Sequence, residues 1–212
     1  MTRRIATAGF LVLATGTLSG CSMLGGAGIG GGRASAGVTS VEQGARLMPT
    51  WRTAIYATSD VNTADVILSD LEPEVLMRAI SDESELRAVD GSVLRVRMFI
   101  TPRAGRTPID FTASNASATL VVMSGGEIGV YGGGGFMLPS GKPGNRYFSG
   151  RLRDATLKPA GATPGFDDLL GASDLSGRVS AQRDDASASR VAAWMGAVVG
   201  ELAPTSLAQK PE

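Results

Sequence analysis

The chain of 212 residues contains no histidine, a single cysteine (Cys21) and three lysines, Lys142, Lys158 and Lys210. Without histidine, a Ser-His-Asp triad, a Cys-His pair and a histidine-ligated zinc site are excluded. A single thiol cannot form an intramolecular disulfide, so the stability of the fold must come from its core. The commonest hydrolytic machinery is missing, and carboxylates, arginines and backbone groups remain.

A surplus of charge is also missing, as are long hydrophobic runs. Twenty basic and twenty acidic side chains balance, whereas general nucleic-acid binding requires a clear basic surplus. The uncharged run Ile5–Leu18 has fourteen residues, and a transmembrane helix needs about twenty. The sequence therefore predicts neither a nucleic-acid partner nor a transmembrane helix.

The N-terminus has the anatomy of an export signal. Arg3 and Arg4 precede the apolar run, and small residues lead to Cys21. Leu18-Ser19-Gly20-Cys21 resembles the lipobox of bacterial lipoprotein precursors. The resemblance implies that residues 1–20 are a signal peptide. It also implies that Cys21 becomes a lipidated N-terminus, whose two or more acyl chains anchor the protein stably to a membrane.

The residue after the cysteine bears on localisation. Ser22 resembles the outer-membrane sorting pattern of two-membrane envelopes; in a single-membrane bacterium, the anchor would place the chain on the outer face of the cytoplasmic membrane. The alternative is an ordinary cleaved signal peptide whose mature chain keeps a free cysteine.

A glycine-rich tether is expected to follow the anchor, over residues 21–40. Seven of the sixteen residues from Ser22 to Gly37 are glycine, a composition typical of a flexible coil with a reach of about 20 Å. Gly28–Arg33 superficially resembles a nucleotide-binding loop, but no strand precedes it and no helix follows, which favours a spacer.

Residues 41–204 are expected to form one mainly β domain, either a two-layer β sandwich or a curved barrel-like sheet. Alternation of apolar residues with period two predicts a strand over 93–100. Gly125-Gly126 predicts a hairpin turn between strands at 118–123 and 127–131. Further strands are expected at 53–58, 64–69, 146–157 and 178–182.

Two segments predict helices. Pro73 suits the first position of a short helix over 73–80. A longer amphipathic helix is expected over 186–202, with Asp184 and Asp185 before it, Pro204 after it and a disordered tail over 205–212. Its apolar stripe favours packing on the sheet over lying on a membrane surface, because its other face lacks the richness in lysine and arginine that helices on membrane surfaces use.

Carboxylates are the remaining route to catalysis or metal binding. Asp167-Asp168 and Asp184-Asp185 are adjacent pairs, for which helix capping and solvation are the simpler interpretation. Asp60, Asn62 and Asp65 share a short segment that departs from an EF-type calcium loop, so a turn stabilised by Asx side chains is favoured. A calcium site built from several loops stays open at this point.

The segment from Tyr131 to Phe136 encloses four consecutive glycines, Gly132, Gly133, Gly134 and Gly135. Five residues separate Gly135 from the next Gly-Lys, and a proline follows, so the segment is not a phosphate-binding P-loop. A bulge or a close backbone approach, in which a side chain such as Trp51 or Trp194 lies flat over the glycines, is favoured. A ligand or partner that contacts the backbone is the alternative.

Charge is uneven along the chain. Residues 60–90 hold nine acids and two arginines, whereas 93–158 hold nine basic residues and three acids. Arg95 and Arg97 should project from one strand face, and Arg151 and Arg153 from another. If those strands are neighbours, the four arginines would form a face for anionic polymer, lipid headgroups or an acidic partner. Pairing with the acids within the domain is the alternative, and it is favoured.

These features predict an envelope lipoprotein that acts as a non-catalytic binding or assembly module, without a cofactor or metal. The membrane is its expected partner through the anchor, together with an envelope protein or an anionic polymer. The candidate contact surfaces are the four arginines and the segment from Tyr131 to Phe136. The alternative is a carboxylate-dependent enzyme that acts on cell-wall or extracellular polysaccharide.

Overall fold

A computed structural model describes residues 34–99 and 114–203 of the chain. The predicted signal peptide, Cys21, the glycine-rich run up to residue 33, Ile100 and the tail lie outside the described residues. Within these ranges the chain is mainly β, with nine strands and three helices.

The strands form one sheet with the order β2-β1-β9-β3-β4-β5-β6-β7-β8. Their bounds are β1 Gly37–Ser40, β2 Arg46–Leu47, β3 Thr53–Ala57, β4 Ala64–Ser69, β5 Gly91–Met98, β6 Ala116–Ser124, β7 Glu127–Pro139, β8 Tyr147–Ala162 and β9 Ser173–Arg183. Neighbouring strands are antiparallel except β3 and β9, which pair in parallel through Ile55–Gln182 and Tyr56–Arg183.

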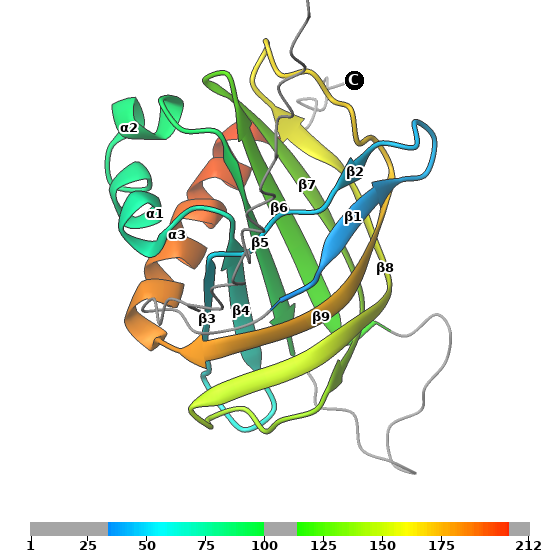
Figure 1. Ribbon diagram of the computed structural model, residues 1–212, viewed down its shortest axis with the longest axis vertical. Helices are drawn as coiled ribbons and strands as arrows, with labels where there is room; N and C mark the ends of the chain where they lie inside the picture. The colour runs from blue at the N-terminus through cyan, green and yellow to red at the C-terminus, as the bar shows by residue number, and fades with distance from the viewer. Residues whose placement is uncertain (1–33, 100–113, 204–212) are drawn as a thin grey trace, which may run out of the picture.

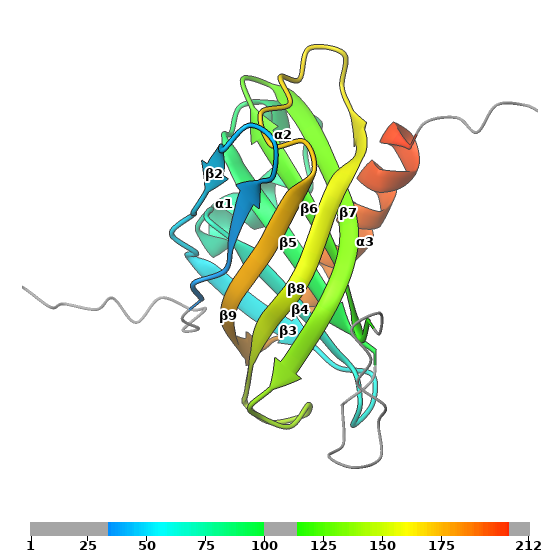
Figure 2. The ribbon, with the colours of Figure 1, turned by 90° about the vertical axis from the view of Figure 1, so that its right-hand side faces the viewer.

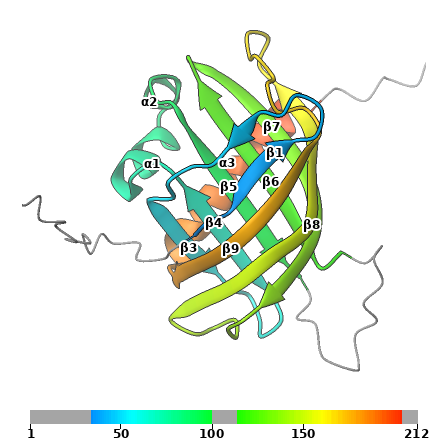
Figure 3. The same cartoon turned by 45° about the vertical axis from the view of Figure 1, so that its right-hand side comes forward.

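The sheet closes on itself because β9 pairs with β8 on one side and with β1 and β3 on the other. The closed curve is seen in Figure 3, where β8, β9 and β1 lie in front of β4, β5 and β6. Alternate side chains fill the interior, among them the fully buried Tyr56, Leu94 and Phe148. Of the two predicted architectures, the structure is the barrel-like sheet.

Three helices cover part of the outer face: α1 Pro73–Ala79, α2 Glu83–Arg87 and α3 Asp185–Leu202. Helix α3 lies against the outside of the sheet (Figure 1), and Val191 and Met195 pack there on Ile67 and Val93 in a second buried cluster. The end of α3 reaches the last residues of β8 at Gly161, whereas β9 and the part of β8 around Arg151 have no helix over their outer face (Figure 2). Among the helices in the described ranges, none has the length and apolarity needed to cross a bilayer.

Most expected elements are present, and the differences have local causes. The expected strand 64–69 and the packing of the long helix on the sheet are confirmed. Strand β7 runs on through the four glycines to Pro139 instead of ending at residue 131. Strand β1 lies within the segment assigned to the tether, where only Val38 among its four residues is a large apolar side chain. Strand β2 and helix α2 were not expected, because each is very short.

Candidate functional site

Three arginines gather on the uncovered outer face of β8 and β9. Along β8, Arg151 and Arg153 alternate with buried Phe148 and Leu152, so both side chains face outward. Arg178 on β9 lies directly opposite Arg151 in the β8–β9 register. We call Arg151, Arg153 and Arg178 the arginine surface.

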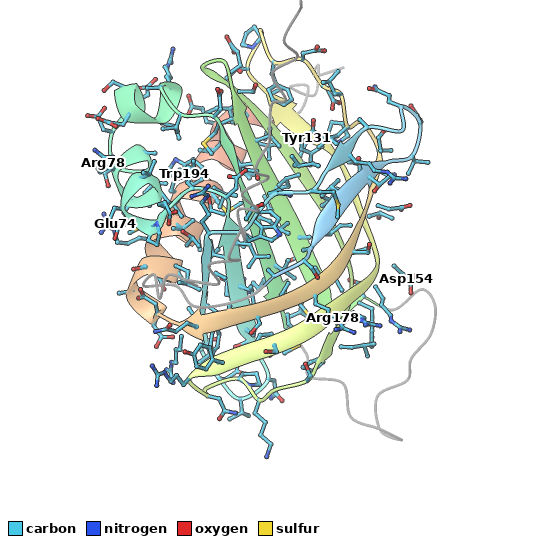
Figure 4. The ribbon with its side chains drawn as sticks, viewed as in Figure 1. Glu74, Arg78, Tyr131, Asp154, Arg178 and Trp194 are labelled. Atoms are coloured by element: carbon cyan, nitrogen blue, oxygen red, sulfur yellow. The ribbon has the colours of Figure 1, made fainter. Side chains whose placement is uncertain are left out.

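The arginine surface surrounds a depression that a β-bulge creates. The β8–β9 register shifts between Leu152 and Ala155, and Asp154 within the shift adopts a φ of 49°, a left-handed conformation. Opposite it, Gly177 has a φ of 138°, and a Cβ there would clash with the carbonyl of Ser35. The resulting depression measures about 510 Å³ and is lined by Ser35, Arg151, Leu152, Arg153, Asp154, Ser176, Gly177 and Arg178. Figure 4 shows Asp154 and Arg178 on this side of the molecule, away from Trp194.

The guanidinium groups of the arginine surface are not held by the fold. Within residues 34–99 and 114–203, no ion pair or side-chain hydrogen bond engages Arg151, Arg153 or Arg178. Arg153 and Arg178 are exposed, and Arg151 is half-buried. Guanidinium groups present several N–H donors to phosphate, sulfate or carboxylate oxygens. The arrangement can therefore bind an anion, and the other polar side chains in its described lining are Ser35, Asp154 and Ser176.

Arg95 and Arg97 lie elsewhere, on β5, and β6 and β7 separate them from β8. Arg95 donates from Nε and Nη2 to the two carboxylate oxygens of Asp65, at 2.8 and 2.7 Å, under helix α3. That hydrogen bonding raises the pKa of Arg95 above its ordinary value, against the effect of burial. Arg97 is exposed opposite Asp65 in the β4–β5 register. The four predicted arginines do not form one face, and internal pairing accounts for Arg95.

The third member of the arginine surface, Arg178, was not among the predicted site residues. In the sequence it begins an expected strand without a neighbouring arginine. Only the pairing of β9 with β8 brings it opposite Arg151. An alternating pattern on each strand marks the outward positions, but it does not reveal which strands are paired.

Two of the four glycines of β7, Gly133 and Gly135, are explained by a close approach of β8, and Gly134 by the carbonyl of Ala116 on β6. A Cβ on Gly133 would overlap the carbonyl of Thr156, and one on Gly135 would overlap Ala155. The β7–β8 register shifts between Gly134 and Phe136, so the two backbones pack closely at this bulge. The contact is thus between two backbones, and it is not made by a tryptophan as expected: Trp51 donates to the Ala36 carbonyl, and Trp194 lies on α3.

Tyr131, at the start of the glycine segment, belongs to the interior core. Its hydroxyl donates to Asp168 at 2.5 Å. Burial raises the pKa of Tyr131, and the hydrogen bond to Asp168 raises it further. Burial alone would raise the pKa of Asp168, but hydrogen bonds from Tyr131 and the N–H groups of Gly171 and Leu170 outweigh burial and lower it. Asp168 thus ties the loop before β9 to the core. Phe136 is half-buried opposite Arg153 in the β7–β8 register.

The other acids singled out in the sequence stabilise turns and helix ends. Asp184 accepts from the N–H of Ser187 and caps α3. Asp185 accepts from Arg183 and from the N–H of Thr58. Asp60 accepts from the N–H groups of Asn62 and Thr63, an Asx turn of the kind expected. In the described ranges, no group of three or more acidic, histidine or cysteine side chains could hold a metal ion.

A second concave region lies on the helical side. A cavity of about 580 Å³ separates α1 and α2 from the C-terminal half of α3 and the β6–β7 turn. Its lining includes Trp194, Leu86 and Ile128, and its charged residues are Asp82, Glu83, Arg87, Glu127 and Glu201. The acid-rich segment of the sequence therefore lies on the side of the molecule opposite the arginine surface (Figure 4).

Comparison of the chain with known protein families, curated proteins and solved structures finds no match. The assignment of a site therefore depends on the chain's own residues. Among the regions described above, the arginine surface is the one in which several charges of one sign converge and the fold does not use them.

Proposed function

We propose that this chain is an envelope lipoprotein whose β domain binds an anionic ligand at the arginine surface. The anchor is supported by the lipobox Leu18-Ser19-Gly20-Cys21, with Ser22 favouring the outer membrane in a two-membrane envelope. The observation that carries the binding function is the convergence of Arg151, Arg153 and Arg178 without an ion pair among the described residues.

Like charges directly opposite each other across two strands destabilise a sheet. The pairing of Arg151 with Arg178 therefore has a small cost that the fold does not recover within the described residues. An anion in the depression would offset this cost, because it would screen both guanidinium groups at once. The placement of the two arginines therefore favours the binding of an anion and not the stability of the sheet.

The anchor is tested by labelling with radioactive fatty acid in a bacterial host that processes lipoproteins. The full precursor should incorporate the label, and Cys21→Ala should not. Equal labelling of the two forms would rule out lipidation at Cys21.

The anion site is tested by cation-exchange chromatography of the mature chain at neutral pH. The variant Arg151→Gln, Arg153→Gln, Arg178→Gln should elute at lower salt than the wild type. A matched control, Arg78→Gln, Arg87→Gln, Arg190→Gln, changes the net charge equally on the helices. It should elute close to the wild type. Equal shifts of the two variants would show that net charge alone sets retention, and would contradict the site.

A further inference from the structure

The start of the described chain lies at the arginine surface. Ser35 lines the depression, and its N–H donates to the carbonyl of Arg178 at 2.8 Å. The next residues, Gly37–Ser40, form β1 and pair with β9 beside it. The chain that leads back to Cys21 therefore joins the domain at the arginine surface and not at the helical side.

The sequence limits how far this surface can be from the anchor. Thirteen residues lie between Cys21 and Ser35, and a fully extended chain from one to the other spans about 50 Å at most. A lipid chain on Cys21 would hold the arginine surface nearer to the bilayer, on average, than the opposite helical side. The acids on that opposite side would be repelled by anionic headgroups, whereas the arginines would be attracted.

The side chains around the arginine surface also suit a membrane interface. Tyr147 occupies the same outer face of β8 as Arg151 and is 42% exposed, and the Cζ atom of Arg146 lies 5.5 Å from the centroid of its ring. Phe136 and Leu138 on β7 lie opposite Arg153 and Arg151, half-buried. Tyrosine and arginine with small apolar patches are typical of surfaces that contact headgroups.

We infer that the arginine surface docks on the anionic phospholipid headgroups of the membrane in which the chain is anchored, and so orients the domain with its helical side outward. This inference depends on the proposed function, because it uses both the anchor and the anion site. It adds the identity of the anion and the orientation of the domain.

The test uses the full mature chain without its lipid, as Cys21→Ser, and vesicles of phosphatidylcholine with or without phosphatidylglycerol. The wild-type surface should bind the anionic vesicles in preference to the neutral ones. Each arginine near an anionic surface contributes a factor of about five in affinity, so the triple glutamine variant should lose about 100-fold. The control Arg78→Gln, Arg87→Gln, Arg190→Gln should stay within about twofold of the wild type.

A second variant distinguishes a loss of vesicle binding from a loss of folding. Ser176 is exposed on β9 and lines the depression. Ser176→Glu leaves every arginine in place but adds a carboxylate among them, and it should also weaken binding to anionic vesicles. Ser176→Gln, which adds a neutral side chain of similar size, should not weaken this binding.

Orientation is measured on the lipidated protein, in which Cys21 is blocked and an introduced cysteine is the only free thiol. A fluorophore on Ser176→Cys should be quenched by nitroxide-labelled headgroups. The same fluorophore on Ala193→Cys, exposed on α3, should be quenched much less. Equal quenching at the two positions would overturn the orientation.

The two proposals fail in different ways. If the triple glutamine variant elutes early from cation exchange but binds anionic vesicles as the wild type does, the anion site stands and the headgroup inference is wrong. If the variant instead loses binding to dextran sulfate while vesicle binding is unchanged, the ligand is a soluble anionic polymer, which also overturns docking on headgroups. If the full precursor incorporates no fatty acid although its vesicle binding is intact, the anion site stands, and both the anchor and the orientation that depends on it are wrong.

Discussion

Two regions on the outside of the same sheet use arginine differently. Under α3, Arg95 is three-quarters buried and binds both carboxylate oxygens of Asp65, whose side chain is 22% exposed. On the uncovered face of β8 and β9, Arg151 lies opposite another arginine. The ion pair of Arg95 with Asp65 allows a helix to cover this charged side chain. Arg151 has no such partner among the described residues.

The difference follows from what covers each region. A helix over the sheet removes water, so a charge beneath it needs a partner with good geometry. Without a helix, water and salt satisfy the guanidinium groups, and like charges can be neighbours at small cost. A covering helix and a carboxylate partner thus distinguish the arginine that serves the fold from the arginines that are available for binding, although the sequence contains the same residue at both places.

Substitution of Arg95 should give the largest effect. Arg95→Gln leaves Asp65 without its partner under the helix, and we expect a loss of about 2 kcal/mol in the free energy of unfolding, less than for a fully buried pair because both side chains keep some exposure. Arg151→Gln should change it by less than about 0.5 kcal/mol. Urea unfolding, followed by tryptophan fluorescence, measures both.

The double variant Arg95→Gln, Asp65→Asn provides the control for Arg95. It removes the uncompensated charge and should recover part of the lost stability. Equal losses in the free energy of unfolding for Arg95→Gln and Arg151→Gln would contradict the distinction between the two regions.

An intermediate loss of stability is expected for Asp168. It is held by hydrogen bonds, whereas the adjacent Asp167 is not held in this way by any of the described residues. Asp168 accepts hydrogen bonds from Tyr131 and two backbone N–H groups, whereas Asp167 is exposed. Asp168→Asn should cost about 1.5 kcal/mol at pH 7, because charge-assisted hydrogen bonds become neutral ones. Asp167→Asn should cost less than about 0.5 kcal/mol.

The pH dependence of this effect has a defined sign. The pKa of Asp168 is lower in the folded state than its ordinary value, so its contribution is complete above the unfolded pKa of about 3.9 and is lost as the pH falls through the folded pKa. The difference in stability between the wild type and Asp168→Asn should therefore narrow below about pH 4. A difference that stays constant down to strongly acidic pH would contradict this role.

The sequence predicts what depends on local patterns. The strand expected at 64–69 matches β4, alternation located β5, and the apolar stripe with Asp184 before it located α3. The mainly β class with a packed C-terminal helix follows from the same patterns. Strand β1 was not predicted, because Gly37–Ser40 has only one large apolar residue. Its pairing partner, β9, also lies far along the chain.

Long-range pairing accounts for what the sequence did not predict at the candidate site. Arg151 and Arg153 were expected to share a face, since they are two residues apart on one strand. The proximity of Arg178 depends on the β8–β9 register, and the separation from Arg95 depends on strand order. The glycine run itself predicted a bulge or close approach, but the backbone that requires Gly133 and Gly135 belongs to β8, and only the β7–β8 register identifies it.

The smallest expected effect has the opposite sign and tests the binding surface most directly. Because Arg178 faces Arg151 across two strands, Arg178→Gln should raise the free energy of unfolding by up to about 0.5 kcal/mol at low ionic strength. Arg97 faces Asp65 in the β4–β5 register, so Arg97→Gln should lower it by a similar amount. Added salt should diminish both differences, since both positions are exposed.

A gain in stability on removing Arg178 would mean that the arginine surface is kept at a cost to the fold, as expected of a surface retained for a ligand. A loss like that of Arg97 would mean that Arg178 serves the fold instead.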